Sequence, residues 1–409
     1  MSSDGTVTFA DIEAAHARFD DPDVVKRTPV VQPASLEAMT DVDELVLKLE
    51  PLPRTGSFKT RGAYNKIQAT LEEGNLDRVI AASAGNHAQG VALAATTLGV
   101  ESTVVMPRTA PQTKVEATRG YGATVELVGK DFREATEYAL ELADETGDEF
   151  VHAYDDPQIV AGQGTLGVEM YEDCPDVDTV IVPIGGGGLI SGIATAFAEL
   201  SPETRIVGVQ ATGAQTVVDS LAKGIPQTVE VDTIADGIAT GGVSELTLSI
   251  IERHVDEVVT VTDAEIADAI LLLMERAKQV VEGAGAASIA ALLSDDLDVE
   301  GETVMPLLCG GNLDMTMLQE VVVHALTRRE QIIRLRVRID DQPGKMQDIS
   351  GIIAEHGANI QTVRHDRALK ELDVGEAYLI FQVETSGAEQ AANILDSIAE
   401  RGYAVEFDT

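Results

Sequence analysis

One lysine of the chain stands where an amine could do covalent chemistry. Lys59 lies within Thr55-Gly56-Ser57-Phe58-Lys59-Thr60-Arg61-Gly62-Ala63, and apolar residues recur at helical spacing directly after it. The sequence therefore predicts Lys59 in or just before the first turn of a helix, after a turn that Gly56 permits and with Ser57 as the cap. A cation is poorly placed at a helix N-terminus, which favours the neutral amine that Schiff-base formation requires. A solvated surface lysine is the alternative that this stretch leaves open.

Four consecutive glycines, Gly185, Gly186, Gly187 and Gly188, separate a buried strand expected at 179–183 from a helix expected at 189–199. In such a turn, successive backbone N–H groups and the helix dipole point at an anion, typically a phosphate. Neither familiar nucleotide pattern fits, because the spacing is not G-x-G-x-x-G and no Gly-Lys-Ser/Thr follows. A tight turn alone would need fewer glycines, so we expect a phosphate site that does not bind a nucleotide.

A second polar loop, Ser83-Ala84-Gly85-Asn86-His87-Ala88-Gln89-Gly90, joins another expected strand to another expected helix. Its backbone N–H groups, with the Ser83 and Asn86 side chains, predict a site for a carboxylate at the helix N-terminus. A simple N-cap would account for Ser83 or Asn86 alone but not for the cluster.

The segment Cys309-Gly310-Gly311-Asn312 ends a strand expected at 303–308. Ligands collect beyond the carboxyl ends of strands in open α/β sheets, so this segment, Lys59 and both glycine-containing loops should converge. A lysine beside a phosphate site without nucleotide signatures suggests pyridoxal phosphate, with Lys59 as its Schiff-base partner.

The elements that position these loops alternate between strand and helix, which predicts a mostly parallel sheet covered on both faces. Strands are expected at 44–49, 79–83, 102–106, 124–128, 149–152, 179–183, 205–211, 258–261 and 303–308, and helices at 9–19, 60–71, 87–98, 112–119, 131–145, 158–172, 189–199, 263–282 and 315–327. After a linker near 327–331 the order becomes βαββαβ, at 332–340, 345–356, 359–366, 375–385, 387–401 and 404–407. That order predicts a small ferredoxin-like domain.

The composition is that of a folded and very acidic protein, with 44% hydrophobic residues and 29 Lys+Arg against 69 Asp+Glu, a net charge of −40. Such a surface repels phosphates, which argues against nucleic acid or anionic lipid as a partner. Salt relieves the self-repulsion, so we expect a halophilic protein. No stretch has the roughly 18–20 apolar residues of a membrane helix, and no signal peptide is visible, so we expect a cytoplasmic location. The two cysteines, Cys174 and Cys309, have no metal-ligand spacing, and no metal site is expected.

The motifs at 55–63, 83–89, 185–189 and 309–312 together resemble the threonine dehydratase (threonine ammonia-lyase) family, over about Pro29 to Leu326. The resemblance implies a tryptophan-synthase-β type α/β fold with two three-layer αβα subdomains, spanning 1–328, in which a small subdomain at about 50–150 is inserted in the large one. It implies elimination of water from L-threonine to give 2-oxobutanoate and ammonia, with L-serine as a second substrate. The reaction would begin isoleucine synthesis or threonine breakdown.

The same resemblance implies roles for individual residues. Lys59 would form the Schiff base and remove the α-proton, and Asn86 would bind the pyridine hydroxyl. Cys309 would stand beside the pyridine nitrogen as a weak partner. The coenzyme phosphate would be bound by Gly185, Gly186, Gly187, Gly188 and Leu189, and the substrate carboxylate by Ser83, Gly85 and His87.

Three positions depart from relatives. Serine racemases have a second hydroxyl where this chain has Ala84, and they place a carboxylate for a divalent metal at the position that aligns with Gln210. Racemisation and Mg²⁺ activation are therefore not expected, although a monovalent cation remains open. Glu282-Gly283-Ala284-Gly285-Ala286 replaces the commoner Glu-Pro-Ala-Gly form, and Glu282 is either near the coenzyme or only a helix-terminal carboxylate.

Residues 332–409 resemble an ACT regulatory domain, with Asp341-Gln342-Pro343-Gly344 as its ligand-loop motif. The resemblance implies a homo-oligomer, dimer or tetramer, and an effector such as isoleucine or valine, bound near Gly344 with Asn359 and Ile360 opposite. Alternatives are a serine dehydratase, a serine racemase, a cysteine-synthase-like β-replacement enzyme of the same fold, or a non-catalytic amino-acid sensor.

Overall fold

The computed structural model describes residues 6–19, 24–74, 76–369 and 371–407. The chain forms two compact units that divide between Leu313 and Asp314. The linker expected at 327–331 falls at the end of helix α13 (Met315–Arg328), and this helix belongs to the C-terminal unit, where it contacts strand β12 (Ile332–Asp340).

The N-terminal unit contains a small parallel sheet in the order β6-β5-β4-β7. Its strands are β4 (Arg78–Ala82), β5 (Glu101–Met106), β6 (Thr124–Leu127) and β7 (Glu149–Phe150). Its helices are α3 (Lys59–Glu73), α4 (Asn86–Leu98), α5 (Gln112–Gly120) and α6 (Phe132–Thr146).

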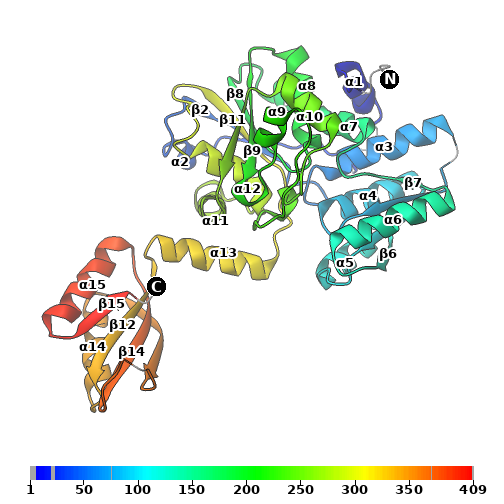
Figure 1. The fold of residues 1–409 in the computed structure, drawn as a ribbon. Coiled ribbons are helices and arrows are strands. Elements are labelled where there is room, and N and C mark those ends of the chain that lie inside the picture. Colours follow the sequence, from blue (N-terminus) through cyan, green and yellow to red (C-terminus); the bar gives the residue numbers. More distant parts are fainter. Residues whose placement is uncertain (1–5, 20–23, 75, 370, 408–409) are drawn as a thin grey trace. The chain divides into compact units, whose positions relative to one another are not determined.

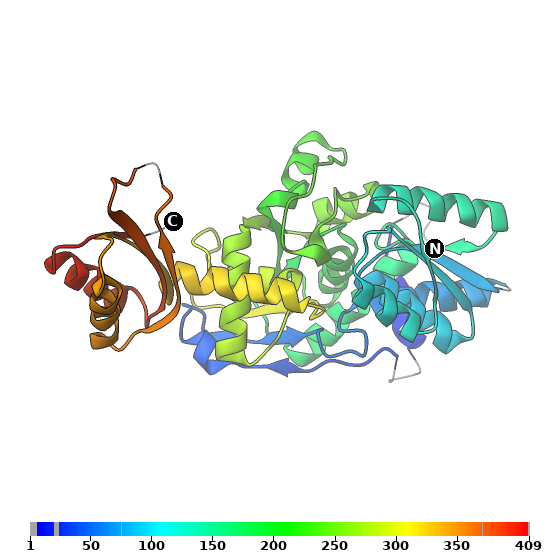
Figure 2. The same cartoon turned by 90° about the horizontal axis from the view of Figure 1, so that it is seen from below.

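Alternate residues of β4 face opposite helices, which is why this strand has few polar residues. Val79 and Ala81 pack in one cluster with residues of α3 and α4, whereas Ile80 and Ala82 pack with the alanines of α6. Helices therefore lie on both faces of the small sheet (Figure 1 and Figure 2).

A larger sheet in the order β1-β3-β11-β8-β9-β10, with β2 also paired to β11, forms the rest of this unit. The β1–β3 pair is antiparallel and the other pairs are parallel. The strands are β1 (Val30–Val31), β2 (Glu44–Leu45), β3 (Leu47–Leu49), β8 (Thr179–Pro183), β9 (Arg205–Ala211), β10 (Glu257–Val261) and β11 (Thr303–Leu308). The helices are α1 (Phe9–Ala17), α2 (Ala34–Glu37), α7 (Pro157–Asp173), α8 (Gly188–Leu200), α9 (Val217–Lys223), α10 (Glu245–His254), α11 (Asp263–Leu272) and α12 (Gly283–Leu292), with short 3₁₀ turns at Thr212–Ala214 and Asp236–Ile238.

Two local expectations are wrong. The helix expected over 263–282 ends early, because a π-helical turn at Leu273–Ala277 follows α11 and Lys278 then takes a left-handed conformation with φ 58°. Ser57 does not cap α3, because its backbone forms a β-bridge with Gly310 and the residue at the cap position is Phe58. The Ser57 hydroxyl is buried without a hydrogen-bond partner in the described part of the chain.

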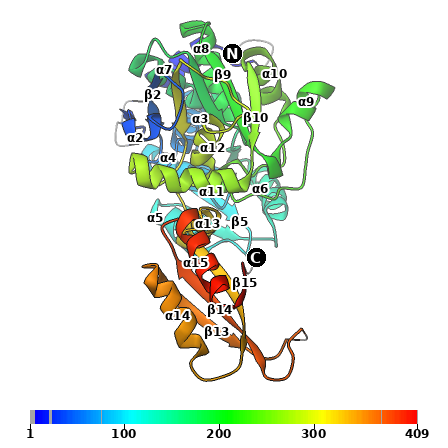
Figure 3. The same ribbon diagram turned by 90° about the vertical axis from the view of Figure 1, so that its left-hand side faces the viewer.

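The C-terminal unit has the βαββαβ order that its sequence predicts, with an antiparallel sheet in the order β13-β14-β12-β15. Besides α13 and β12 it contains α14 (Lys345–Glu355), β13 (Asn359–Asp366), β14 (Glu376–Glu384), α15 (Ala388–Glu400) and β15 (Ala404–Phe407). The isoleucines of α14 and α15 pack in one cluster with alternate residues of β12 and β14, so both helices cover the same face (Figure 3). None of the described helices has the length and apolarity to cross a membrane.

Candidate active site

Lys59 is the first residue of α3, and the loop before it is tied to the loop after β11. Gly311 N–H donates to Gly56 O at 2.9 Å, and Asn312 Nδ2 donates to Thr55 O at 2.6 Å. Gly56 has φ +70°, and a Cβ there would lie 2.5 Å from Asn312 Oδ1. Only glycine permits both the left-handed turn and this approach, so the turn that the sequence predicts at Gly56 is present.

The Lys59 amine lies in a confined and largely apolar place. Its Nζ is 3.4 Å from Ala153 O and 5.0 Å from the centre of the Phe58 ring. Burial lowers the pKa of Lys59 to about 8, and electrostatic interactions with Cys309 and Glu282 oppose that shift. The neutral amine, the form that acts as a nucleophile, is therefore a minor but much larger fraction near physiological pH than for a lysine of ordinary pKa. The solvated surface lysine is excluded.

The four glycines meet Lys59 in one small cavity of about 60 Å³. Leu189, Tyr154, Thr240 and Cys309 also line it. Gly187 has φ +90°, and helix α8 begins at the next residue, so the dipole of α8 adds to the backbone N–H groups of the turn.

Thr240 gives this cavity an unsatisfied polar atom. Its Oγ1 is buried and has no hydrogen-bond partner within the described chain, and a Cβ on Gly185 would lie 3.3 Å from it. A buried hydroxyl of this kind costs free energy until a ligand pairs with it. Thr240 therefore fits an anion that rests on the glycine turn.

A second cavity, of about 360 Å³, extends from Lys59 to the loop after β4. Ser83, Gly85, Asn86 and His87 line it, and Cys309 and Glu282 lie on its other side. Ser83 Oγ accepts the Gly85 N–H at 3.1 Å, which shapes the loop before α4. The structure thus brings together the lysine, the glycine turn and the carboxylate loop that the sequence singles out.

The amide of Asn86 is held in one orientation by two partners. Asn312 Nδ2 donates to Asn86 Oδ1 at 2.7 Å, and Asn86 Nδ2 donates to Glu282 Oε1 at 2.7 Å. One N–H of the amide is left to donate to a ligand in the cavity.

Glu282 stands at the N-cap of α12 but makes no capping hydrogen bond with its side chain. Burial raises its pKa to about 7, against the lowering effects of Asn86, Lys114 and Lys59. Of the two interpretations of Glu282, the structure favours a residue of the site over a simple helix-terminal carboxylate.

His87 and Cys309 are both kept neutral. His87 Nε2 lies 2.9 Å from Val151 O, and burial lowers its pKa to about 3, so the ring donates to the backbone. Burial also raises the pKa of the Cys309 thiol well above its usual range, with Glu282 adding to the shift. A neutral thiol is only a weak hydrogen-bond donor and acceptor.

The sequence alone missed several cavity residues. Phe132 and Lys114 belong to the small subdomain and Asp236 and Thr240 to the large one, and Lys114 Nζ lies 3.2 Å from Asp236 Oδ2. Phe132 and Lys114 stand in no glycine-rich motif, whereas Asp236 and Thr240 lie in the stretch Asp236-Gly237-Ile238-Ala239-Thr240-Gly241-Gly242, whose three glycines were an available signal.

The side-chain amide of Gln210 is engaged in hydrogen bonds with the backbone. Its Oε1 accepts the N–H groups of Thr216 at 3.0 Å and Val217 at 2.9 Å, and its Nε2 donates to Ala214 O at 3.3 Å. The amide thus pairs with the turn after β9. Among the described residues no three metal-binding side chains are grouped.

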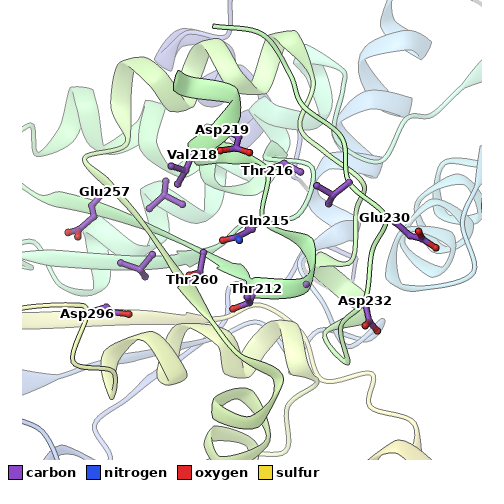
Figure 4. A pocket seen from close by; sticks show the side chains of 14 residues that line it. Thr212, Gln215, Thr216, Val218, Asp219, Glu230, Asp232, Glu257, Thr260 and Asp296 are labelled. Carbon is purple, nitrogen blue, oxygen red and sulfur yellow. The ribbon is translucent and has the colours of Figure 1, made fainter. Parts of the chain in front are cut away.

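A larger hollow of about 700 Å³ lies beside β10 and shares no lining residue with the two cavities around Lys59. Figure 4 shows the carboxylates of Asp219, Glu230, Asp232, Glu257 and Asp296 around it. Neither an amine nor an anion cradle is present among these lining residues, so this hollow takes no part in the chemistry at Lys59.

A partly buried lysine of lowered pKa next to a backbone anion cradle, without a nucleotide pattern, is the arrangement typical of a pyridoxal-phosphate enzyme. The chain belongs to that family: the family described as pyridoxal-phosphate dependent enzyme matches residues 22–310.

Individual proteins are similar to this chain over most of its length. The chain is 44% identical to the L-threonine ammonia-lyase of Thermotoga maritima over 98% of its own length and 99% of that protein. Its fold matches the processed form of threonine deaminase isoform 2 from Solanum lycopersicum, with a TM-score of 0.73 and 37% identity over 78% of this chain and 92% of that one. Maize serine racemase matches with a TM-score of 0.72 and 34% identity over 80% and 99%.

Proposed function

We propose that this protein is an L-threonine ammonia-lyase, which converts L-threonine to 2-oxobutanoate and ammonia, and L-serine to pyruvate and ammonia. The observation that carries the proposal is the Lys59 amine, which has a lowered pKa and lines both the cavity of the glycine turn and the cavity of the Ser83 loop. The similarity to a protein of that activity over nearly the whole chain supports it.

Different residues of the site bind the coenzyme and the substrate. The N–H groups of Gly185, Gly186, Gly187, Gly188 and Leu189 hold the coenzyme phosphate, and the free N–H of Asn86 binds the pyridine hydroxyl. Ser83, Gly85 and His87 belong to the loop that holds the substrate carboxylate. When bound, the coenzyme supplies an electron sink next to the substrate Cα.

Lys59 is the base of the reaction. Its neutral amine accepts the α-proton of the substrate, the β-hydroxyl departs as water, and hydrolysis of the resulting enamine releases the oxo acid and ammonia. Cys309, as a neutral thiol, would give the ring nitrogen of the bound coenzyme no counter-charge, which would make the coenzyme a weak electron sink. A weak sink suits elimination, because the departing β-group removes the charge at once.

Two variants test this assignment. Wild-type protein incubated with pyridoxal phosphate should absorb in the visible range and release oxo acid from L-threonine, and Lys59→Ala should lose both. Lys223→Ala, an exposed lysine at the end of α9, is the matched control and should retain both. A Lys59→Ala protein that keeps the absorbance and the turnover would contradict the proposal.

Serine racemase of the same fold is the second candidate. Ala84 lines the cavity and carries no hydroxyl, so this position provides no acid or base for the opposite face of the substrate. Incubation with L-serine followed by chiral analysis separates the two, since accumulation of D-serine would favour the racemase.

We also propose that the C-terminal unit is an ACT domain that binds a branched amino acid such as isoleucine or valine. Gly344, with φ +97°, is the N-cap residue just before α14, and Asn359 and Ile360 begin β13. Asn359, at the start of β13, pairs with Glu384 at the end of β14. Gly344 comes after Asp340, the last residue of β12, which pairs with Glu376 at the start of β14, so Gly344 and Asn359 lie at opposite ends of the sheet. A ligand that touches both therefore needs two copies of the chain, which supports a homo-oligomer.

The regulation is tested by measuring turnover of L-threonine with increasing isoleucine or valine. The effect should depend on effector concentration and disappear in a chain shortened after Arg328. An effect that survives the shortening would place the effector elsewhere.

The net charge of −40 further supports a protein that works in a salt-rich cytoplasm.

A further inference from the structure

Phe132 is an exposed aromatic residue that lines the cavity of the active site. The side chain is 56% exposed, yet it shares the 360 Å³ cavity with Lys59 and with the Ser83 loop. Single exposed apolar residues are common on protein surfaces and need no explanation. Phe132 differs from such residues because its ring lines the cavity of the reactive amine, so a ligand bound in the cavity can cover the ring.

The helix start that carries Phe132 is well fixed. Asp131 Oδ1 accepts the N–H of Glu134 at 2.9 Å, and Glu134 Oε2 accepts the N–H of Lys130 at 3.0 Å. Gly129 has φ +75°, and a Cβ there would lie 2.6 Å from Glu134 Cβ. The backbone therefore presents the ring from a capped helix rather than from an irregular loop.

The position of Phe132 on α6 directs it to the substrate end of the small sheet. Ala135, Ala139 and Ala143 form the buried face of α6 and pack on the side chains of β4 and β5. Phe132 precedes Ala135 by one helical turn and so continues this face. Ala82 packs in the same cluster as these alanines and is the last residue of β4, after which the Ser83 loop begins.

The rest of that lining contains several small or apolar groups, among them Phe58, Ala84, Ala153 and Ala239. A substrate with an apolar group on its β-carbon would remove part of the Phe132 ring from water, and a substrate without one would leave the ring exposed. Threonine carries a β-methyl group and serine does not.

We propose that Phe132 determines specificity, by covering the β-methyl group of the substrate and so favouring threonine over serine. The inference rests on the proposed elimination reaction and adds to it the residue that distinguishes the two substrates. One methyl group in an apolar pocket is worth about 10–200-fold in kcat/KM, so a measurable share of that preference depends on this ring.

The kinetic test compares Phe132→Ala and Phe132→Leu with wild type, using kcat/KM for L-threonine and for L-serine. Phe132→Ala should lower the threonine-to-serine ratio about tenfold, chiefly by weakening threonine, and Phe132→Leu should lower it less. Leu140→Ala is the matched control, since Leu140 is an exposed apolar residue (48%) on the same helix that does not line the cavity. A ratio unchanged in Phe132→Ala, or an equal loss for both substrates, would overturn the inference.

Failure of the proposed function gives a different result, because the wild-type protein would then release oxo acid from neither amino acid. A binding measurement independent of turnover completes the test. The chain contains no tryptophan, so Phe132→Trp introduces a single indole whose emission reports its surroundings. In the coenzyme-loaded protein, L-2-aminobutanoate should change the emission at lower concentration than L-alanine, because it adds one methyl group and neither ligand can eliminate water. An emission that neither ligand alters, although both change the coenzyme absorbance, would show that the ring does not cover the substrate.

Discussion

The side-chain amide of Asn86 donates a 2.7 Å hydrogen bond to Glu282 Oε1, joining the N-terminus of α4 in the small subdomain to the N-terminus of α12 in the large one. The two residues are 196 positions apart in the chain. Because Asn312 binds the oxygen of the same amide, Glu282 decides which way the Asn86 N–H groups point.

Loss of the Glu282 carboxylate should therefore weaken coenzyme binding through Asn86. We expect Glu282→Ala to lower the affinity for pyridoxal phosphate by roughly tenfold, about the value of one hydrogen bond between polar groups at a buried site. Glu282→Gln keeps a side-chain oxygen that can accept the Asn86 N–H and should lose much less. Titration of the apoenzyme by absorbance measures both affinities, and equal losses in the two variants would contradict the role of the acceptor.

The rate at which the apoenzyme captures pyridoxal phosphate should follow the protonation of Lys59. Burial lowers the pKa of this amine to about 8 from its ordinary 10.5, and only the neutral amine attacks an aldehyde. The capture rate should therefore rise with pH, reach half its maximum near pH 8 and level off above it. Stopped-flow absorbance from pH 6 to about 10 measures the profile, and a midpoint near the ordinary lysine value would show that the amine is solvated.

Gly186 should tolerate no side chain while Tyr154 is present. A Cβ at Gly186 would lie 2.2 Å from Tyr154 Cδ1, so Gly186→Ala must displace either the ring or the glycine turn. Overpacking of this kind costs about 1–3 kcal/mol, and coenzyme affinity should fall by about tenfold or more.

The same prediction has an internal control. If the clash is the cause, Tyr154→Ala in the Gly186→Ala background should restore part of the affinity, giving a favourable coupling in a double-mutant cycle. Gly120→Ala on α5 meets no atom within 4 Å and should leave binding unchanged. A Gly186→Ala protein that binds the coenzyme normally would refute the argument.

Arg61 should be essential for stability because it pairs with two buried carboxylates, Glu50 and Glu169. Its Nη2 lies 2.9 Å from Glu50 Oε1 and its Nη1 2.7 Å from Glu169 Oε1, and all three side chains are almost completely buried. Arg61→Met would leave the buried Glu50 without its cationic partner, whereas Glu169 keeps Lys48, and should lower the free energy of unfolding by about 3–5 kcal/mol. Arg133→Met, which removes an exposed ion pair with Glu137, should change it by about 1 kcal/mol or less. Denaturant unfolding of the three proteins measures this, and equal effects of the two substitutions would contradict the prediction.

Salt should stabilise the fold. With a net charge of −40, repulsion between carboxylates opposes the compact state, and ions screen that repulsion over a Debye length of about 10 Å at 0.1 M and about 3 Å at 1 M. The midpoint of thermal unfolding should therefore rise steadily between 0.1 and about 2 M KCl. An unfolding temperature that is independent of salt would remove the argument for adaptation to high salt.

The sequence alone determined the elements and the chemical groups. Strands β8, β9, β11 and β12 cover the residues expected, because runs of branched apolar residues bounded by turn residues specify a strand locally. The Ser83 loop and the four glycines could be predicted because such residues between a strand and a helix are typical of an anion site. Lys59 alone could also have been a surface lysine, and its role was predicted from its combination with those loops.

Only the tertiary structure decided how these groups act on one another. A π-helical turn interrupts the long helix expected at 263–282. Ser57 forms a β-bridge with Gly310 instead of capping α3. In both places tertiary contacts outweigh the local preference of the sequence. The contact of Glu282 with Asn86 and the place of Phe132 in the cavity likewise depend on elements far apart in the chain. The sequence specifies which side chains are available, but burial sets the pKa of Lys59, and burial exists only once both subdomains have packed around it.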